Sequence, residues 1–218
     1  DQIHAVIRAT HVNHGGKTNG YTVPNPLAQA ELVRQALDKA GVNARAVSYV
    51  EAHGTGTELG DPIEVAGLTQ AFRHDTQECG YCALGSAKSN IGHLEAASGI
   101  AGLIKVVLQM QHAKLVPSLH AGELNPKIEF GRTPFVLQQT LADWPQPLLD
   151  QVGADQPVPQ PRIAGVSSFG AGGSNAHVVM KEYAVEPPAW AEPGQDCMIL
   201  LSASTEERLH VVLARLHA

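Results

Sequence analysis

The sequence predicts a layered α/β domain built on a mixed sheet. Short apolar runs typical of strands alternate with amphipathic helical patterns through most of the chain, as in α/β folds. Two strand patterns near residues 162–180 flank the turn Gly170–Gly173, and two strands joined by a glycine turn form an antiparallel hairpin. With 218 residues, of which 44% are hydrophobic, the chain is long enough to bury a core.

The periodicities place the elements in order. Strands are expected over residues 3–7, 46–50, 82–86, 135–138, 162–169 and 175–180. Helices are expected over residues 26–40, from Asp61 or Pro62 to about Phe72, and over residues 96–112.

The first helix has the clearest boundaries. An Asn- and Gly-rich loop over residues 11–20 precedes it. Asn25 can cap the helix, because its side chain can accept hydrogen bonds from the first free backbone N–H groups. Pro26 suits the first helical position, and Gly41 suits the residue that follows the last turn.

The C-terminal part differs in composition. Residues 142–161 contain five prolines and are expected to form an irregular surface loop, and residues 184–194 contain three and are expected to be a linker. Ser204–Glu207 match a capping box that begins a final helix. We therefore expect a domain over residues 1–183, and a linker with the start of a helical subdomain over residues 184–218.

Charge and composition argue against several classes of protein. The net charge of −6 offers no basic surface for nucleic acid. No run approaches the roughly 18 apolar residues that a membrane helix needs, and no signal peptide is visible, so a cytoplasmic location is expected. The chain begins without Met on a strand pattern, and we expect it to be a piece of a longer protein.

Cys79, Cys82 and Cys197 are too few to build a disulfide scaffold for a chain of this length. Cys79 and Cys82 match C-x-x-C, but the pair precedes a strand, not a helix whose dipole would lower a thiol pKa. A second pair of ligands with zinc spacing is missing from the sequence. We expect three packing cysteines and no metal site.

The segment VEAHGTGTELGDPIE, residues 50–64, is either a phosphate cradle or a loop that presents His53 for chemistry. Its glycines are spaced by two and four residues, whereas the dinucleotide fingerprint needs two and three, and no P-loop Lys-Ser/Thr follows. The next helix begins with acidic residues, which would repel a phosphate. These observations favour a loop that presents His53, with hydroxyls from Thr55 and Thr57 beside it.

A second loop is built in the same way. The segment GSAKSNIGHLE, residues 85–95, also follows a strand and precedes a helix, which puts Lys88 and His93 in the same structural position as His53. Loops at the carboxyl ends of strands line the functional crevice of an α/β sheet, so these side chains are expected to converge. Zinc binding is the rival use of the histidines, but a third ligand is missing and Lys88 adds an unfavourable charge.

Three motifs resemble the β-ketoacyl synthase family, specifically the ketosynthase domains of modular type I polyketide synthases. They are HGTGT with GDPIE (residues 53–64), GSAKSNIGH (residues 85–93) and SSFGAGGSNAH (residues 167–177), and the loop over residues 13–25 is also similar. The resemblance implies a thiolase-like fold, of which this chain matches the C-terminal half, followed by the start of a post-ketosynthase linker. In that family the nucleophilic cysteine lies in the N-terminal half, and no cysteine here has its sequence context.

The resemblance also implies a reaction, the decarboxylative Claisen condensation of an acyl thioester with a malonyl-type extender. His53 and His93 would donate hydrogen bonds to the thioester carbonyl of the extender. Lys88 would fix His93, with Glu64 or Asp61 as its counter-charge.

Other residues carry supporting roles by the same resemblance. The backbone N–H of Ala171 would contribute to an oxyanion hole, and Thr55 and Thr57 would bind the pantetheine arm. The remaining supporting residues are Asp61, Glu64, Asn90, Phe169 and Gly170. The other histidines are expected to be structural or exposed, namely His11, His14, His112, His120 and His177.

The expected partners are an acyl carrier protein, the N-terminal cysteine-bearing half and, in the complete domain, a second copy in a homodimer. No directly bound cofactor is expected, because the substrates are carried on the phosphopantetheine of the carrier. Without its other half the fragment is expected to be inactive.

Two other functions are considered. The first alternative is a non-condensing, carrier-docking or gatekeeping domain. Loss of the histidine of HGTGT would indicate such a domain, and His53 is present. A nucleotide-binding module is a third hypothesis, which saturable binding of a dinucleotide or ATP would reveal.

Overall fold

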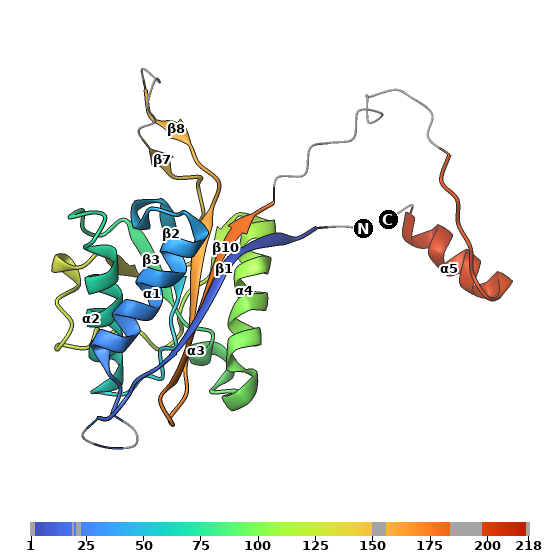
Figure 1. The fold of residues 1–218 in the computed structure, drawn as a ribbon. Coiled ribbons are helices and arrows are strands. Elements are labelled where there is room, and N and C mark those ends of the chain that lie inside the picture. Colours follow the sequence, from blue (N-terminus) through green and yellow to red (C-terminus); the bar gives the residue numbers. More distant parts are fainter. Residues whose placement is uncertain (1–2, 19, 21–22, 150–155, 184–197, 217–218) are drawn as a thin grey trace. The chain divides into compact units, whose positions relative to one another are not determined.

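A six-stranded mixed sheet forms the centre of residues 1–183 in the computed structural model (Figure 1). Strands β9, β2, β3 and β5 are parallel, whereas β10 lies antiparallel between β1 and β9. In spatial order the strands are β1 (Ala5–His14), β10 (Ser174–Glu182), β9 (Ile163–Phe169), β2 (Val47–Glu51), β3 (Cys82–Gly85) and β5 (Phe135–Leu137). The structure describes residues 3–18, 20, 23–149, 156–183 and 198–216. Residues 184–218 form a second unit.

Helices cover both faces of this sheet. Helices α1 (Pro26–Ala40) and α2 (Gly60–Phe72) lie on one face and α4 (Ser98–His112) on the other (Figure 1). Successive side chains of a strand point to opposite faces. Val50 of β2 therefore packs in the core with α1 and α2, and its neighbour Tyr49 packs in the core with α4. The predicted layered α/β arrangement with a mixed sheet is confirmed.

The predicted boundaries of the first helix are correct. The side chain of Asn25 accepts hydrogen bonds from the N–H groups of Leu27 and Ala28, and Pro26 is the first residue of α1. Gly41 ends the helix with φ of 62°, in the left-handed region that glycine adopts without a steric penalty.

The structure corrects four expectations. Strand β1 extends to His14, because it pairs with β10 along almost its whole length, so residues 11–14 are not part of a loop. Residues 142–161 contain paired strands, with β6 (Ala142–Asp143) on β4 (Lys114–Leu115) and β7 (Leu148–Leu149) on β8 (Val158–Pro159).

The other two corrections concern the starts of helices. The cap of α5 (Glu206–Leu216) is Thr205, whose hydroxyl oxygen accepts from the N–H of Arg208, and not Ser204. Helix α4 begins at residue 98, after a 3₁₀ turn over Glu95–Ala97.

Short elements complete the described structure. They are helix α3 (Lys88–Ile91) and the 3₁₀ turns Ala44–Ala46 and Phe130–Arg132. The expected linker over residues 184–194 lies outside the described residues. Within the described ranges, none of the helices has the length and apolar character needed to cross a membrane.

The hairpin of β9 and β10 contains a buried histidine. His177 is 1% exposed, and its Nδ1 lies 3.0 Å from the hydroxyl oxygen of Ser167. Burial lowers the pKa of His177 from 6.5 to about 4, because the charged imidazole would lose its hydration. His177 is therefore neutral in the folded protein near pH 7, in line with the structural role expected for it.

Acid is expected to destabilise the fold partly through His177. Between pH 6.5 and about 4 the unfolded chain binds a proton that folded His177 does not, so stability falls as the pH falls through this window. The full effect is about 3 kcal/mol. Urea unfolding of the complete domain at several pH values should show a smaller loss in His177→Asn than in the wild type. Equal losses in the two proteins would contradict a neutral buried His177.

Candidate active site

Two histidines meet at one edge of the sheet. His53 follows the end of β2, and His93 follows β3 and α3, so both come from the carboxyl ends of neighbouring parallel strands. Their ring centroids are 5.4 Å apart with an interplanar angle of 82°, an edge-to-face arrangement. The ring of Phe169, at the end of β9, lies 5.7 Å from that of His53. Segments far apart in the sequence therefore converge, as the motif positions predict.

Hydrogen bonds define which nitrogen of each ring carries the proton. Nδ1 of His53 accepts from the N–H of Phe169 at 3.3 Å, and Nδ1 of His93 accepts from the N–H of Glu95 at 2.8 Å. Nδ1 is therefore the acceptor in both rings, which leaves Nε2 as the ring nitrogen that carries the N–H. Burial, Lys88 and His93 lower the pKa of His53 to about 4, so this ring is neutral near pH 7. His53 thus presents an N–H donor without a positive charge.

Glu64 holds the backbone of the His53 loop. Its two carboxylate oxygens accept from the N–H groups of His53 and Gly54, each at 2.8 Å. Burial raises the pKa of Glu64 to about 7, although these two N–H groups and Lys88 oppose the rise. Gly54 has φ of 45°, and a Cβ there would lie 2.8 Å from Cβ of Ser86, so the loop needs glycine at this position.

The exposed threonines of the same loop lie next to each other. The hydroxyl oxygens of Thr55 and Thr57 are 3.3 Å apart, and that of Thr57 also accepts from Gly60 N–H at the start of α2. Asp61 accepts from the N–H of Gly56 at 3.1 Å. Thr57 and Asp61 therefore shape the loop, and both threonines are exposed residues.

Lys88 is the first residue of α3 and is half-buried. Burial lowers its pKa, and the carboxylates of Glu64 and Glu51 oppose that shift. Of the two acids expected as counter-charge, Glu64 acts on Lys88, whereas Asp61 is engaged with Gly56. Asn90 bonds the carbonyl oxygen of Pro117 at 3.4 Å, so its side chain contacts the segment after β4.

The glycine turn that follows β9 is held by the loop after β1. Nε2 of His14 donates to the carbonyl oxygen of Gly172 at 3.0 Å, since Nδ1 of the same ring accepts from the N–H of Gly16. Gly15 N–H donates to the carbonyl oxygen of Gly173 at 2.7 Å. His14 therefore positions the turn; the sequence analysis expected His14 to be structural or exposed, and did not anticipate this partner.

Ala171 and Gly170 are exposed at the tip of this turn. The N–H of Gly170 donates to the carbonyl oxygen of Ser174 at 2.7 Å, and that of Gly173 to the carbonyl oxygen of Gly170 at 2.9 Å. Among the described residues, no acceptor lies within hydrogen-bond distance of the Ala171 N–H. The N–H of Gly172 likewise has no recorded acceptor among the described residues, so two backbone donors of the turn are available for a ligand.

The two cysteines that the structure describes lie in different surroundings. Cys82 is buried, and burial raises the pKa of its thiol well above the usual range. Cys79 is exposed, and its sulfur lies 3.0 Å from Nη2 of Arg73. Cys197 lies outside the described residues. Over the described ranges, no group of three or more His, Cys, Asp or Glu residues could hold a metal ion.

Comparison with known families decides the identity of this arrangement. The sequence model described as "Beta-ketoacyl synthase, C-terminal domain" matches residues 4–122, and that described as "Ketoacyl-synthetase C-terminal extension" matches residues 125–218. The chain belongs to the β-ketoacyl synthase family. Its thiolase-like α/β fold and the predicted resemblance to ketosynthases of modular polyketide synthases are thereby confirmed.

The relatives of this ketosynthase chain are polyketide synthases. It is 54% identical to Polyketide synthase PksL of Bacillus subtilis over 99% of the chain and 5% of that protein. It is 53% identical to Polyketide synthase ThaG of Burkholderia thailandensis over 99% of the chain and 4% of that protein.

Solved ketosynthase structures share the fold. The oxazolomycin ketosynthase domain OzmH KS7 of Streptomyces albus matches with a TM-score of 0.83 and 48% identity, over 99% of this chain and 36% of that one. The ketosynthase from module 6 of the bacillaene synthase of Bacillus subtilis matches with a TM-score of 0.79 and 38% identity, over 99% and 35%. The chain therefore spans about a third of these solved ketosynthase chains.

Proposed function

We propose that this chain supplies the extender-binding half of a condensing ketosynthase in a polyketide synthase. The observation that carries the proposal is the pair of histidine rings, 5.4 Å apart, each with Nδ1 occupied by a backbone N–H. Two Nε2–H donors suit the oxygen of one thioester carbonyl. The neutral form of His53 matters, because a neutral imidazole N–H stabilises an enolate without transferring a full proton to it.

In the proposed reaction, the malonyl-type extender loses CO2, and the electrons of that C–C bond form an enolate whose oxygen receives hydrogen bonds from His53 and His93. The enolate carbon then attacks the acyl thioester on the cysteine of the N-terminal half. A new C–C bond forms, and the cysteine leaves as a thiolate. Lys88 holds a positive potential beside the enolate, and the Ala171 N–H donates to the oxygen of the attacked acyl carbonyl.

An exposed apolar face of α4 supports the proposal that the N-terminal half packs against this chain. On α4, Ile100, Ile104 and Leu108 are 56%, 51% and 48% exposed, and their spacing of four residues puts them on one stripe. This α4 stripe borders an apolar groove of about 600 Å³, also lined by Ala101, Ile91, Val116 and Leu141. Exposed apolar stripes of this kind mark protein interfaces.

The remaining partners follow from the chemistry. Both substrates of a condensation are thioesters, and in this proposal they arrive on the phosphopantetheine of an acyl carrier protein, whose arm Thr55 and Thr57 bind. The amide groups of the arm need such hydrogen-bond partners once they leave water. A homodimer of the complete domain is part of the same proposal.

This chain alone is expected to take up no acyl group from an acyl-carrier thioester. Cys82 is buried as an unreactive thiol, and Cys79 lies outside the site. Intact-mass measurement checks this, and an acyl adduct on Cys79, Cys82 or Cys197 would contradict it. When the cysteine-bearing half is joined to the chain, both acylation and the β-ketoacyl product should appear. Acylation without product from any extender would favour the non-condensing alternative.

A further inference from the structure

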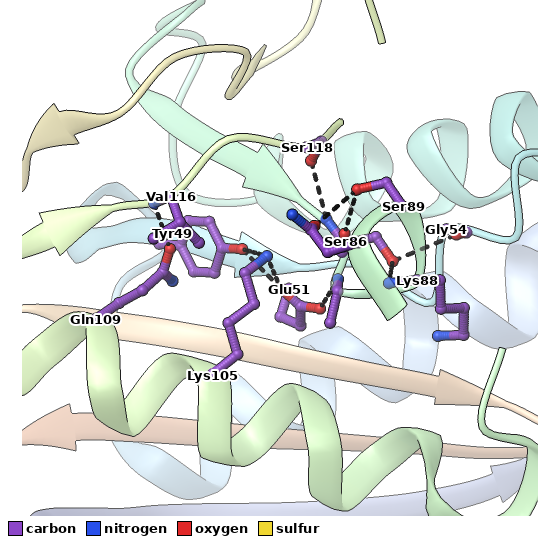
Figure 2. A network of polar contacts seen from close by, with 12 residues as sticks. Tyr49, Glu51, Gly54, Ser86, Lys88, Ser89, Lys105, Gln109, Val116 and Ser118 are labelled. Atoms are coloured by element: carbon purple, nitrogen blue, oxygen red, sulfur yellow. Dashed lines mark hydrogen bonds and ion pairs between the residues drawn. The ribbon is translucent and has the colours of Figure 1, made fainter. Parts of the chain in front are cut away.

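A buried polar cluster is formed by Tyr49 and Glu51 of β2 with Lys105 of α4 (Figure 2). Glu51 ends β2, two residues before His53, and its side chain is 3% exposed. Its Oε2 accepts from the hydroxyl of Tyr49 at 2.6 Å and from Nζ of Lys105, on α4, at 2.8 Å. Lys105 also donates to the Tyr49 oxygen at 2.8 Å. We call these three residues the Glu51 cluster.

The other oxygen of Glu51 reaches the segment that carries Lys88. Oε1 accepts from the N–H of Ala87 at 2.6 Å. Ala87 directly precedes α3, and α3 has no side-chain cap of its own. Glu51 therefore supplies the acceptor for a backbone N–H at the start of the helix whose first residue is Lys88.

Two glycines next to this cluster leave room for its side chains. A Cβ at Gly102 of α4 would lie 3.0 Å from Cγ of Glu51, and a Cβ at Gly85 would lie 2.7 Å from the Tyr49 oxygen. Larger residues at either position would push the cluster apart. A buried ion pair gains little net stability, because both charges lose their hydration. We therefore infer that the cluster serves to position neighbouring residues and contributes little to the stability of the fold.

Neighbouring contacts attach the same turn to the His53 loop. The Ser86 hydroxyl donates to the carbonyl oxygen of Gly54 at 3.3 Å, and Ser86 N–H donates to the Ser118 hydroxyl at 3.2 Å. Figure 2 shows this chain of contacts running from Lys105 to Gly54. The turn between β3 and α3 is thus held at two consecutive residues, Ser86 and Ala87.

We propose that Glu51 is a positioning residue for Lys88: its carboxylate, held by Tyr49 and Lys105, binds the Ala87 N–H and thereby fixes the turn from which Lys88 projects, in the same loop that carries His93. This inference rests on the proposed condensation for its effect on rate, but the position of Lys88 can be measured independently of activity.

The test is Glu51→Gln in the complete ketosynthase domain that contains this chain. The amide replaces one acceptor oxygen by a donor, so it cannot accept from Ala87, Tyr49 and Lys105 together. Condensation is expected to fall about tenfold, the effect of losing one charge-assisted hydrogen bond, while acyl loading and the KM for the extender carrier stay unchanged. Acetylation of Lys88 by an amine-reactive reagent, relative to exposed Lys39, is expected to rise by a similar factor.

The matched control is Glu31→Gln, an exposed glutamate on α1, which should change none of these quantities. Three results would overturn the inference. The first is slower condensation without faster labelling of Lys88, and the second is an equal fall in loading and condensation. The third is no change in any of these quantities. If Glu51→Gln does not fold, Tyr49→Phe is the second test, because it removes one hydrogen-bond donor to Glu51. It is expected to increase the labelling of Lys88 as well. Unchanged labelling of Lys88 in Tyr49→Phe would overturn the inference. If the unsubstituted domain loads but never condenses, the proposed function fails while the labelling result still stands.

Discussion

His53→Ala in the complete ketosynthase domain is expected to lower the condensation rate by about 10²- to 10³-fold, the usual cost of removing one oxyanion donor. The substitution removes the Nε2–H that faces the developing enolate oxygen in the proposed reaction. Acyl loading should stay nearly unchanged, because in this proposal the cysteine and its own backbone donor belong to the other half. Mass spectrometry of the acylated cysteine and of the β-ketoacyl product separates the two steps.

The matched control is His74→Ala, which removes an exposed histidine beside Asp75, in neither of the two histidine loops. It should change neither step. A His53→Ala protein that condenses at close to the original rate would remove His53 from the proposed mechanism. Equal losses of loading and condensation would point instead to a general disturbance of the fold.

Gly165→Ala is expected to destabilise the domain by about 1–3 kcal/mol, the usual cost of overpacking a core. Gly165 lies in β9 opposite Val179, two residues from His177 along β10, and a Cβ at Gly165 would lie 2.8 Å from both Cε1 and Nε2 of the buried His177 ring. The ring cannot move freely, because its Nδ1 is 3.0 Å from the Ser167 hydroxyl oxygen. Scanning calorimetry should show a Tm lower by several degrees.

Gly122→Ala is the matched control, since a Cβ at Gly122 meets no atom within 4 Å. Its Tm should stay close to that of the wild type. The double variant Gly165→Ala with His177→Ala should be no less stable than His177→Ala alone, because the clash has lost one partner. A Gly165→Ala protein with an unchanged Tm would contradict the packing seen around His177.

The secondary structure could be predicted where a pattern is local. The cap at Asn25, the stop at Gly41 and the hairpin turn at Gly170 depend on residues that are neighbours in the sequence. The length of β1 could not be predicted, because residues 11–14 become a strand only through pairing with β10, more than 150 residues later. Strand β6 was missed for the same reason, since its partner β4 lies in a separate part of the sequence, whereas β7 and β8 are two-residue strands in a proline-rich segment with too short a pattern to recognise.

The meeting of His53 with His93 could be anticipated, because parallel neighbouring strands end at the same edge of a sheet. Single contacts across that edge could not. His14 reaches Gly172 over 158 residues, and Lys105 reaches Glu51 over 54. Neither residue stands in a motif that specifies its partner, so their positioning roles appear only in three dimensions.

The α4 stripe also has a consequence for how such a protein is made. Ile100, Ile104 and Leu108 would promote self-association if they met water for long, because exposed apolar surface is the usual origin of aggregation during folding. In the proposed complete domain, the N-terminal half leaves the ribosome first. The stripe would then emerge next to a partner that has already been synthesised. The time for which its apolar side chains are exposed to water would depend on the rate of translation and not on the diffusion of a separate partner.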